Sequence, residues 1–200
     1  MPSTRDPQYA ARLATLERAW WKKVVPDPYR WFLRRQRLGF VLDVGCGIGR
    51  GLRYLDGNGV GIDHSEAAVA TCRQQGFTAC TPDEFDRSGH ARPGRFDALV
   101  CSHVLEHLSV DDEHALLATY LPYVRAGGRV VLITPQQRGY ASDATHVRFV
   151  DDHALADVAT RFGLTGAPRS FPLPRWFGRA FTYNEFVLVA TMPAMPVRRS

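Results

Sequence analysis

Residues 40–52 read FVLDVGCGIGRGL, an apolar run that ends in an acid and leads into four alternate glycines. The glycines are Gly45, Gly47, Gly49 and Gly51. A glycine-rich turn between a buried strand and a helix lets a ligand approach the backbone, and the free N–H groups of the helix favour an anionic end. The stretch therefore predicts a strand, a ligand-binding turn and a helix.

The glycine spacing does not match the dinucleotide-binding pattern G-x-G-x-x-G. Counted from Gly45 the third glycine would fall at Arg50, and counted from Gly47 it would fall at Leu52. The pattern is instead D-x-G-x-G-x-G, with Asp43 two residues before the first glycine. This spacing argues against a nicotinamide oxidoreductase.

The composition indicates one soluble domain. The chain has 200 residues, 45% of them hydrophobic and 22% charged, which is enough for a core of its own. No apolar run reaches the roughly 18 residues that a membrane span requires. Residues 1–13 lack the apolar centre of a secretory signal, so we expect a cytoplasmic protein.

Charge and cysteines carry little functional signal. The net charge is +5, but 23 of the 25 basic residues are arginines spread over most of the chain, which favours a GC-rich genome over a nucleic-acid surface. The four cysteines form no C-x-x-C pair, so we expect reduced, buried thiols and no zinc site. A nucleic-acid partner is therefore not expected.

Short apolar runs and helix-like segments alternate from residue 40 onward. The expected strands cover 40–44, 59–63, 77–81, 96–102 and 128–134, and the expected helices cover 49–55, 65–75 and 111–124. Ser65 and Asp111 are the expected N-caps of the last two helices. Such alternation predicts a doubly wound α/β fold with a parallel sheet.

The two ends of the chain differ from this core. A helix at 151–163 precedes two directly joined strands, 164–173 and 179–192, which should pair antiparallel. Two amphipathic helices, 8–24 and 29–37, come before the core. We expect a single domain over 1–200, with an N-terminal helical lid at 1–39, a cofactor-binding core at 40–135 and a substrate-side loop, helix and hairpin at 136–192.

Asp63 stands twenty residues after Asp43, at the tip of the second expected strand. A carboxylate in this place can accept hydrogen bonds from both hydroxyls of a ribose. A turn aspartate with no ligand is the alternative. The strand context favours ribose binding.

Four segments resemble, in order, the motifs of the class I S-adenosylmethionine-dependent methyltransferases, most closely the small-molecule branch. They are VLDVGCGIG (41–49), GVGIDHS (59–65), FDALVCSHVLEHL (96–108) and LPYVRAGGRVVLITP (121–135). The resemblance implies a Rossmann-like, seven-stranded, mostly parallel sheet with an antiparallel C-terminal hairpin. It also implies S-adenosylmethionine as cofactor and S-adenosylhomocysteine as product.

The resemblance implies a role for each matching residue around the cofactor. Asp43 and the glycine turn would hold the methionine portion, Asp63 the ribose, and Ser102 with His103 the sulfonium and amino end. His64 would lie beside the adenine, opposite Thr81 and Pro82. The implied cofactor-binding set is Asp43, Gly45, Cys46, Gly47, Gly49, Asp63, His64, Thr81, Pro82, Ser102 and His103. Thr81 departs from the family, which often has an acid there; Asp83 is the alternative.

A hydroxyl acceptor needs a general base, and histidine is the commonest choice. His146, in DATHVRFV after the fifth strand, is expected over the carboxyl edge of the sheet, where doubly wound folds bind ligands. Asp143 is a candidate to orient it. Glu106 and His107 of VLEHL complete the expected catalytic set, with a structural role left open for both.

Aromatic residues of the expected lid and hairpin are candidates to stack on the acceptor, and an arginine to bind its anionic group. The expected substrate-binding residues are Tyr29, Trp31, Arg34 and Tyr183. No metal-binding motif is evident and none is predicted, although acids near His146 leave a metal-assisted mechanism open.

The sequence thus favours a methyltransferase of a small polar acceptor, most of all O-methylation of a sugar or glycoside. N-methylation of a small molecule, methylation of RNA or protein, and a binding module without catalysis remain alternatives. A homodimer is left open, and no membrane association is expected.

Overall fold

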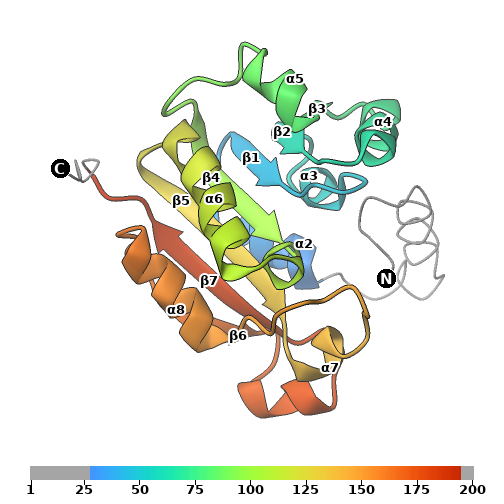
Figure 1. The fold of residues 1–200 in the computed structure, drawn as a ribbon, viewed down its shortest axis with the longest axis vertical. Coiled ribbons are helices and arrows are strands. Elements are labelled where there is room, and N and C mark those ends of the chain that lie inside the picture. The colour runs from blue at the N-terminus through green and yellow to red at the C-terminus, as the bar shows by residue number, and fades with distance from the viewer. Residues whose placement is uncertain (1–27, 195–200) are drawn as a thin grey trace. The chain divides into compact units, whose positions relative to one another are not determined.

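The computed structural model describes residues 28–194, so the expected helix at 8–24 lies outside the described residues. The chain divides into two compact units, Met1–Ala91 and Arg92–Ser200 (Figure 1). Each unit has strands and helices of its own. The single domain expected from the sequence, with its inner boundaries, stays a prediction.

The first unit alternates helices and parallel strands. Its strands are β1 (Val41–Val44), β2 (Gly59–Ile62) and β3 (Ala79–Cys80), and its helices are α2 (Pro28–Arg35), α3 (Arg50–Tyr54), α4 (Glu66–Gln74) and α5 (Pro82–Asp86). The strand order is β3-β2-β1, with Val41 opposite Gly59 and Gly61 opposite Ala79. The glycine turn, Asp63 and Thr81 follow the three strands, so all three lie at the carboxyl edge of this sheet.

Local signals explain where α4 begins and how it packs. Ser65 is its N-cap, as expected, because the Ser65 hydroxyl accepts the N–H of Ala68 at 3.3 Å. Its inner face contributes Val69 and Cys72 to an apolar cluster that also contains Cys46 of the glycine turn. The helix therefore packs directly against that turn.

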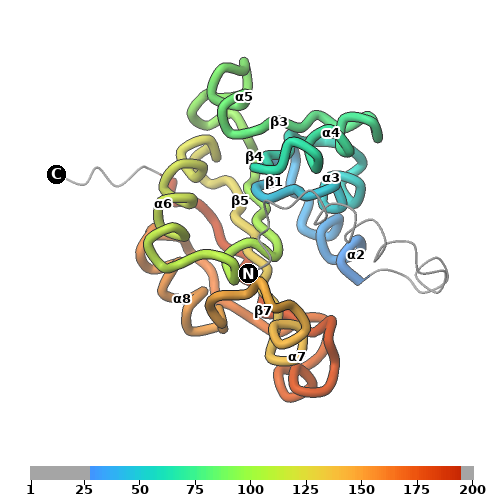
Figure 2. Tube along the Cα trace, turned by 45° about the vertical axis from the view of Figure 1, so that its right-hand side comes forward, coloured from blue at the N-terminus to red at the C-terminus, as the bar shows by residue number. Residues whose placement is uncertain are grey.

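The second unit is a mixed sheet with helices. Its strands are β4 (Phe96–Ser102), β5 (Val124–Pro135), β6 (Pro168–Phe171) and β7 (Glu185–Thr191), in the order β4-β5-β7-β6. Its α-helices are α6 (Val110–Tyr120), α7 (Gln137–Tyr140) and α8 (Asp152–Arg161), with 3-10 turns η2 (Leu105–His107), η3 (Leu121–Tyr123) and η4 (Arg175–Arg179). Strands β4 and β5 are parallel, whereas β5–β7 and β6–β7 are antiparallel. Figure 2 shows α6 and α8 next to each other beside these strands.

The fold class expected from the sequence is confirmed. The described residues form seven strands that alternate with helices, and the C-terminal strands pair antiparallel. None of the described helices is long and apolar enough to cross a membrane.

Several boundaries differ from the sequence expectation: the expected helix at 111–124 ends at Tyr120, and the expected strand at 128–134 begins at Val124. Asp111 is not the N-cap of α6; Ser109 is, because its hydroxyl accepts the N–H of Asp112 at 3.1 Å. The last strand begins at Glu185 rather than at 179, because residues 175–179 form a 3-10 helix and residues 180–184 form turns. A serine followed three residues later by an acid is a helix-start signal, so this cap was readable in the sequence.

Candidate functional site

The glycine turn of the first unit has the backbone that its sequence predicts. Gly45, Gly47 and Gly49 have φ angles of +73°, +52° and +83°, in the left-handed region that other residues adopt at a cost. The N–H groups of Gly45 and Cys46 both donate to the carbonyl of Ile62, at 2.8 and 3.0 Å. The turn is thereby fixed to the end of β2.

The fourth glycine, Gly51, leaves room for the side chain of Asp43 in β1. A Cβ on Gly51 would lie 2.5 Å from Oδ2 of Asp43, so only glycine lets α3 come this close. The Asp43 side chain is buried, and its Oδ2 accepts no hydrogen bond from the described residues. Burial, and then the charge of Asp63, raise the pKa of Asp43 from 3.8 to about 7, against a backbone hydrogen bond from Leu52.

Asp63 accepts two backbone hydrogen bonds. The Gly47 N–H donates to Oδ2 at 2.8 Å, and the Ser65 N–H donates to Oδ1 at 2.9 Å. A carboxylate has about four lone-pair positions, so each oxygen keeps one for a further donor. The side chain is 10% exposed, and its contact with a ribose stays a prediction.

The neighbouring expected cofactor residues have local partners. Thr81 is the N-cap of α5 in a capping box with Glu84, and Pro82 is the first residue of that helix. His64 is half exposed, with Nδ1 3.7 Å from Oδ1 of Asp63. Their proximity to the adenine stays a prediction.

Cys46 contributes backbone rather than a reactive thiolate. Its sulfur lies 4.0 Å from that of Cys72, and both cysteines are buried and free. The hydrogen bond with Cys72, and then burial, raise the pKa of the Cys46 thiol well above its usual range. This agrees with the reduced, buried thiols expected from the composition.

In the second unit, β4 ends at Ser102 and is followed by a residue in an unusual conformation. His103 has a φ of +58°, and its N–H donates to the carbonyl of Ile133 on β5 at 2.9 Å. Its Nδ1 lies 3.3 Å from Oε1 of Glu106, and its Nε2 lies 3.7 Å from Oε1 of Glu185. The imidazole thus stands between two buried carboxylates.

Glu106 is fully buried, and neither oxygen of its carboxylate accepts a hydrogen bond from the described residues. Its backbone carbonyl accepts the N–H groups of Val147 and Arg148, at 2.9 and 3.2 Å. These two bonds join η2 to the segment after α7 and so bring His146 to Glu106. His146 Nε2 lies 3.9 Å from Glu106 Oε1.

The tautomer of His146 follows from its partner. Its Nδ1 lies 2.7 Å from the carbonyl oxygen of Tyr140, which only accepts, so Nδ1 carries the proton and Nε2 keeps its lone pair. The imidazole also stacks on the Tyr140 ring, with centroids 5.1 Å apart. Its side chain is 8% exposed. Asp143, expected to orient His146, instead accepts the N–H and hydroxyl of Thr145.

His107, like His146, has its Nδ1 close to a backbone carbonyl. Its Nδ1 lies 3.2 Å from the carbonyl oxygen of Thr145, and its ring centroid lies 4.7 Å from that of His146. Burial, opposed in part by the charge of Glu106, lowers the pKa of His107.

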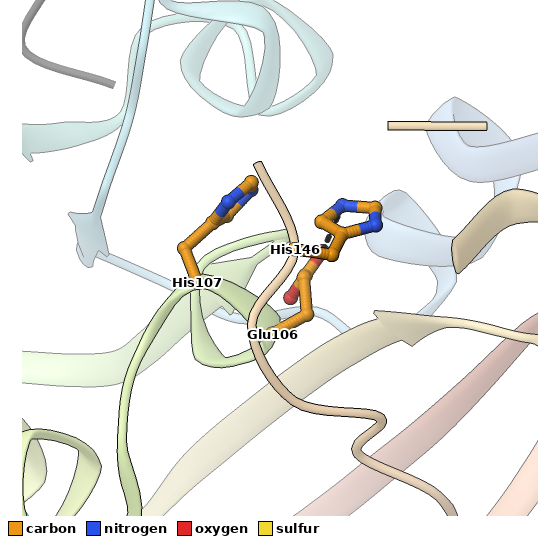
Figure 3. Close-up of side chains that lie close together, drawn as sticks. All are labelled: Glu106, His107 and His146. Carbon is orange, nitrogen blue, oxygen red and sulfur yellow. Dashed lines mark ion pairs between the residues drawn. The ribbon is translucent and has the colours of Figure 1, made fainter. Parts of the chain in front are cut away.

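Glu106, His107 and His146 each offer one ligand atom, and these atoms all lie within 4.8 Å of one another (Figure 3). The sequence singled out each of the three but did not predict their cluster. A usable signal existed: β4 and β5 are parallel neighbours, and polar residues after their carboxyl ends meet at one edge. No sequence signal pointed to Tyr140 or Glu185.

The four expected acceptor residues have different surroundings. Trp31 and Tyr183 are exposed, at 59% and 44%. Tyr29 is buried, and the Arg50 guanidinium lies 5.2 Å from its ring centroid. Arg34 already donates to the Tyr54 carbonyl and pairs with Asp56. Contact of these side chains with an acceptor stays a prediction.

Comparisons with known proteins agree on one family. A family model described as "Methyltransferase domain" matches residues 22–167. A ubiquinone biosynthesis O-methyltransferase from Thiobacillus denitrificans is 30% identical over 151 residues, and one from Pseudomonas aeruginosa is 27% identical over the same length. These alignments cover 66% of this chain and 64% of each relative, so the chain spans less than two thirds of the length of these relatives.

Solved structures show the same fold. A chain of the Haloferax volcanii complex between the Trm112 methyltransferase activator and a methyltransferase superposes with a TM-score of 0.71, at 20% identity over 96% of this chain and 98% of that one. A SAM-dependent methyltransferase from Archaeoglobus fulgidus superposes with a TM-score of 0.65, at 18% identity over 82% of this chain and 92% of that one.

The family model matches well over half of the chain. The chain belongs to the methyltransferase-domain family, and it shares its fold with solved S-adenosylmethionine-dependent methyltransferases.

Proposed function

We propose that this chain methylates a hydroxyl group of a small polar acceptor, a sugar or glycoside, with His146 as the general base. The observation that carries this proposal is the arrangement of His146: Nδ1 is held by the Tyr140 carbonyl, which leaves the lone pair of Nε2 to accept a proton. A hydroxyl is a weak nucleophile until its proton is removed, and this is the task that such an imidazole performs.

Residues of the first unit account for cofactor binding. Bound S-adenosylmethionine supplies a methyl group on a sulfonium, which leaves as a neutral thioether. The free lone pairs of Asp63 accept the ribose hydroxyls, and the Asp43 carboxylate offers its unpaired Oδ2 to a donor of the methionine portion. Ser102, His103, His64, Thr81 and Pro82 are proposed to complete this set.

Residues of the second unit account for the proton. When His146 takes the proton of the acceptor hydroxyl at Nε2, the ring becomes an imidazolium 3.9 Å from the buried Glu106 carboxylate. This opposite charge in a water-poor place stabilises the imidazolium and so favours the transfer. His107, whose ring lies next to that of His146, is the third member of the proposed catalytic set.

The named relatives support oxygen as the acceptor atom, because the two quoted above are O-methyltransferases. N-methylation is the second candidate. A phosphoethanolamine N-methyltransferase from Arabidopsis thaliana is 30% identical over 100 residues, although these cover only 20% of that protein. Exposed Trp31 and Tyr183 offer flat faces for a sugar ring, which supports the glycoside acceptor. A cytoplasmic location belongs to the same proposal.

The test is transfer of a labelled methyl group from S-adenosylmethionine to a panel of sugars, glycosides, phenols and small amines. We expect label on an oxygen of a sugar or glycoside, identified by the carbon chemical shift of the new methyl group. Label on an amine would establish the second candidate instead. Label only in RNA or protein fractions of a cell extract would overturn the proposal.

A further inference from the structure

The carboxylate of Glu106 is buried but has few hydrogen-bond donors around it. Its side chain is fully buried, yet both carboxylate oxygens lack hydrogen bonds from the described residues. Two imidazoles of the described residues approach its Oε1: Nδ1 of His103 lies at 3.3 Å and Nε2 of His146 at 3.9 Å. A buried carboxylate with so few donors is costly unless a cation completes its surroundings.

Neither His107 nor His146 directs its Nδ1 at this carboxylate. Nδ1 of His146 is bonded to the Tyr140 carbonyl, and Nδ1 of His107 faces the Thr145 carbonyl. The Thr145 hydroxyl also lies 3.2 Å from Nδ1 of His107, but it donates its proton to Asp143 Oδ1, so both Thr145 oxygens can accept from this nitrogen. In both neutral rings the proton therefore lies on Nδ1, and Nε2 has a lone pair. A histidine that ligates a metal is oriented in this way, with its other nitrogen donating to a carbonyl or carboxylate.

We propose that Glu106, His107 and His146 form a binding site for one divalent transition-metal ion. Two imidazoles and one carboxylate suit zinc, iron and manganese, and three protein ligands leave a coordination position open. The three ligand atoms lie within 4.8 Å of one another. Bonds of about 2.1 Å in tetrahedral geometry need separations of about 3.4 Å, so modest side-chain rotations close the site.

The backbone already holds the two parts of the site together. The Glu106 carbonyl accepts the N–H groups of Val147 and Arg148, the two residues after His146. Figure 3 shows the three side chains converging from these two segments. The ligands therefore come from a preformed arrangement rather than from separate mobile loops.

An ion in this place occupies the Nε2 lone pair of His146. In the metal-bound protein, the acceptor hydroxyl would bind the open position and lose its proton to solvent because the metal lowers its pKa. This catalytic use of the ion rests on the proposed function. In the metal-free protein, His146 acts as the base. Binding of the ion itself does not depend on which acceptor is used.

The experiment measures metal binding directly, without turnover. The full chain, stripped with a chelator, is titrated with Co²⁺, whose visible absorption reports nitrogen and oxygen ligation, and with Zn²⁺ in competition with a chromophoric chelator. We expect one ion per chain. Glu106→Gln and His146→Ala should each weaken binding at least tenfold, whereas His153→Ala, which removes an exposed histidine of α8, should leave it unchanged.

Glu106→Gln keeps the shape of the side chain, and near-ultraviolet circular dichroism of the metal-free variants shows whether they are folded. Saturable binding that all three variants retain would place the ion elsewhere and overturn the proposal, as would the absence of saturable binding to the wild type. Neither result touches the proposed O-methylation, which fails only in the methyl-transfer assay.

Discussion

Both units bury acids at the carboxyl ends of parallel strands, but the groups that surround these acids differ. In the first unit, Asp63 accepts backbone N–H groups from Gly47 and Ser65. In the second unit, the Glu106 carboxylate accepts no hydrogen bond from residues 28–194 and lies near the imidazoles of His103 and His146. Backbone amides fix an acid as a permanent acceptor for a ligand's hydroxyls. Imidazoles surround an acid with groups that exchange protons or bind metals, so the first edge suits binding and the second suits chemistry.

The largest expected effect is a loss of turnover without a loss of cofactor affinity. His146→Ala removes the proposed base, and we expect turnover to fall by about 10²–10⁴-fold, the usual contribution of a positioned general base. Cofactor affinity, measured by calorimetry, should stay the same. His114→Ala, an exposed histidine stacked on Phe162, is the matched control and should leave turnover intact. Full turnover of His146→Ala would remove the histidine base.

The next effect is a pH-dependent loss of folding stability, which comes from Asp43 in the first unit. The pKa of Asp43 is raised to about 7 by burial and by Asp63, so the cofactor-free folded state binds this proton more tightly than the unfolded state. Stability from this group is therefore present below about pH 4 and is lost as the pH rises through about 7. At about 1.4 kcal/mol per pKa unit, the loss reaches roughly 4 kcal/mol as an upper bound.

Asp43→Asn tests this cost because the amide does not ionise. Denaturant unfolding of the cofactor-free proteins at pH 4 and pH 8 should show the wild type losing stability relative to the variant as the pH rises. A stability difference that stays constant between the two pH values would contradict the raised pKa of Asp43.

A smaller effect concerns the ribose. Asp63→Ala removes the carboxylate whose remaining lone pairs are proposed to accept the ribose hydroxyls, so cofactor binding should weaken by about 1–3 kcal/mol. Asp83→Ala, at the first turn of α5, is the comparison for the alternative adenine contact. If calorimetry gave unchanged affinity for Asp63→Ala, the ribose assignment would be wrong.

The smallest effect compares the helix starts of the two units. Ser65 caps α4 as the sequence predicted, whereas Ser109, not Asp111, caps α6. Ser109→Ala should lower the free energy of unfolding by about 1 kcal/mol. Asp111→Ala should change it by a few tenths, because this acid only faces the helix dipole. Chemical denaturation of both variants decides between the two caps, and equal losses would refute Ser109.

The sequence predicted the first unit closely because its functional contacts are local. The left-handed turn needs glycines at fixed positions, and Asp63 bonds the N–H of Ser65 only two residues away. Short-range geometry of this kind is written in residue spacing. The purpose of Gly51 was not readable, because its clash partner, Asp43, meets it only once α3 packs back on β1.

Patterns within a few residues and motifs in order were enough to predict the α/β fold, the glycine turn and the family. The cluster of Glu106, His107 and His146 depends instead on contacts between distant parts of the chain. The bonds from Val147 and Arg148 to the Glu106 carbonyl span about forty residues of chain, and the Tyr140 carbonyl selects the tautomer of His146. The chemistry of a buried carboxylate depends on which groups surround it in space, and spacing along the chain does not specify those groups.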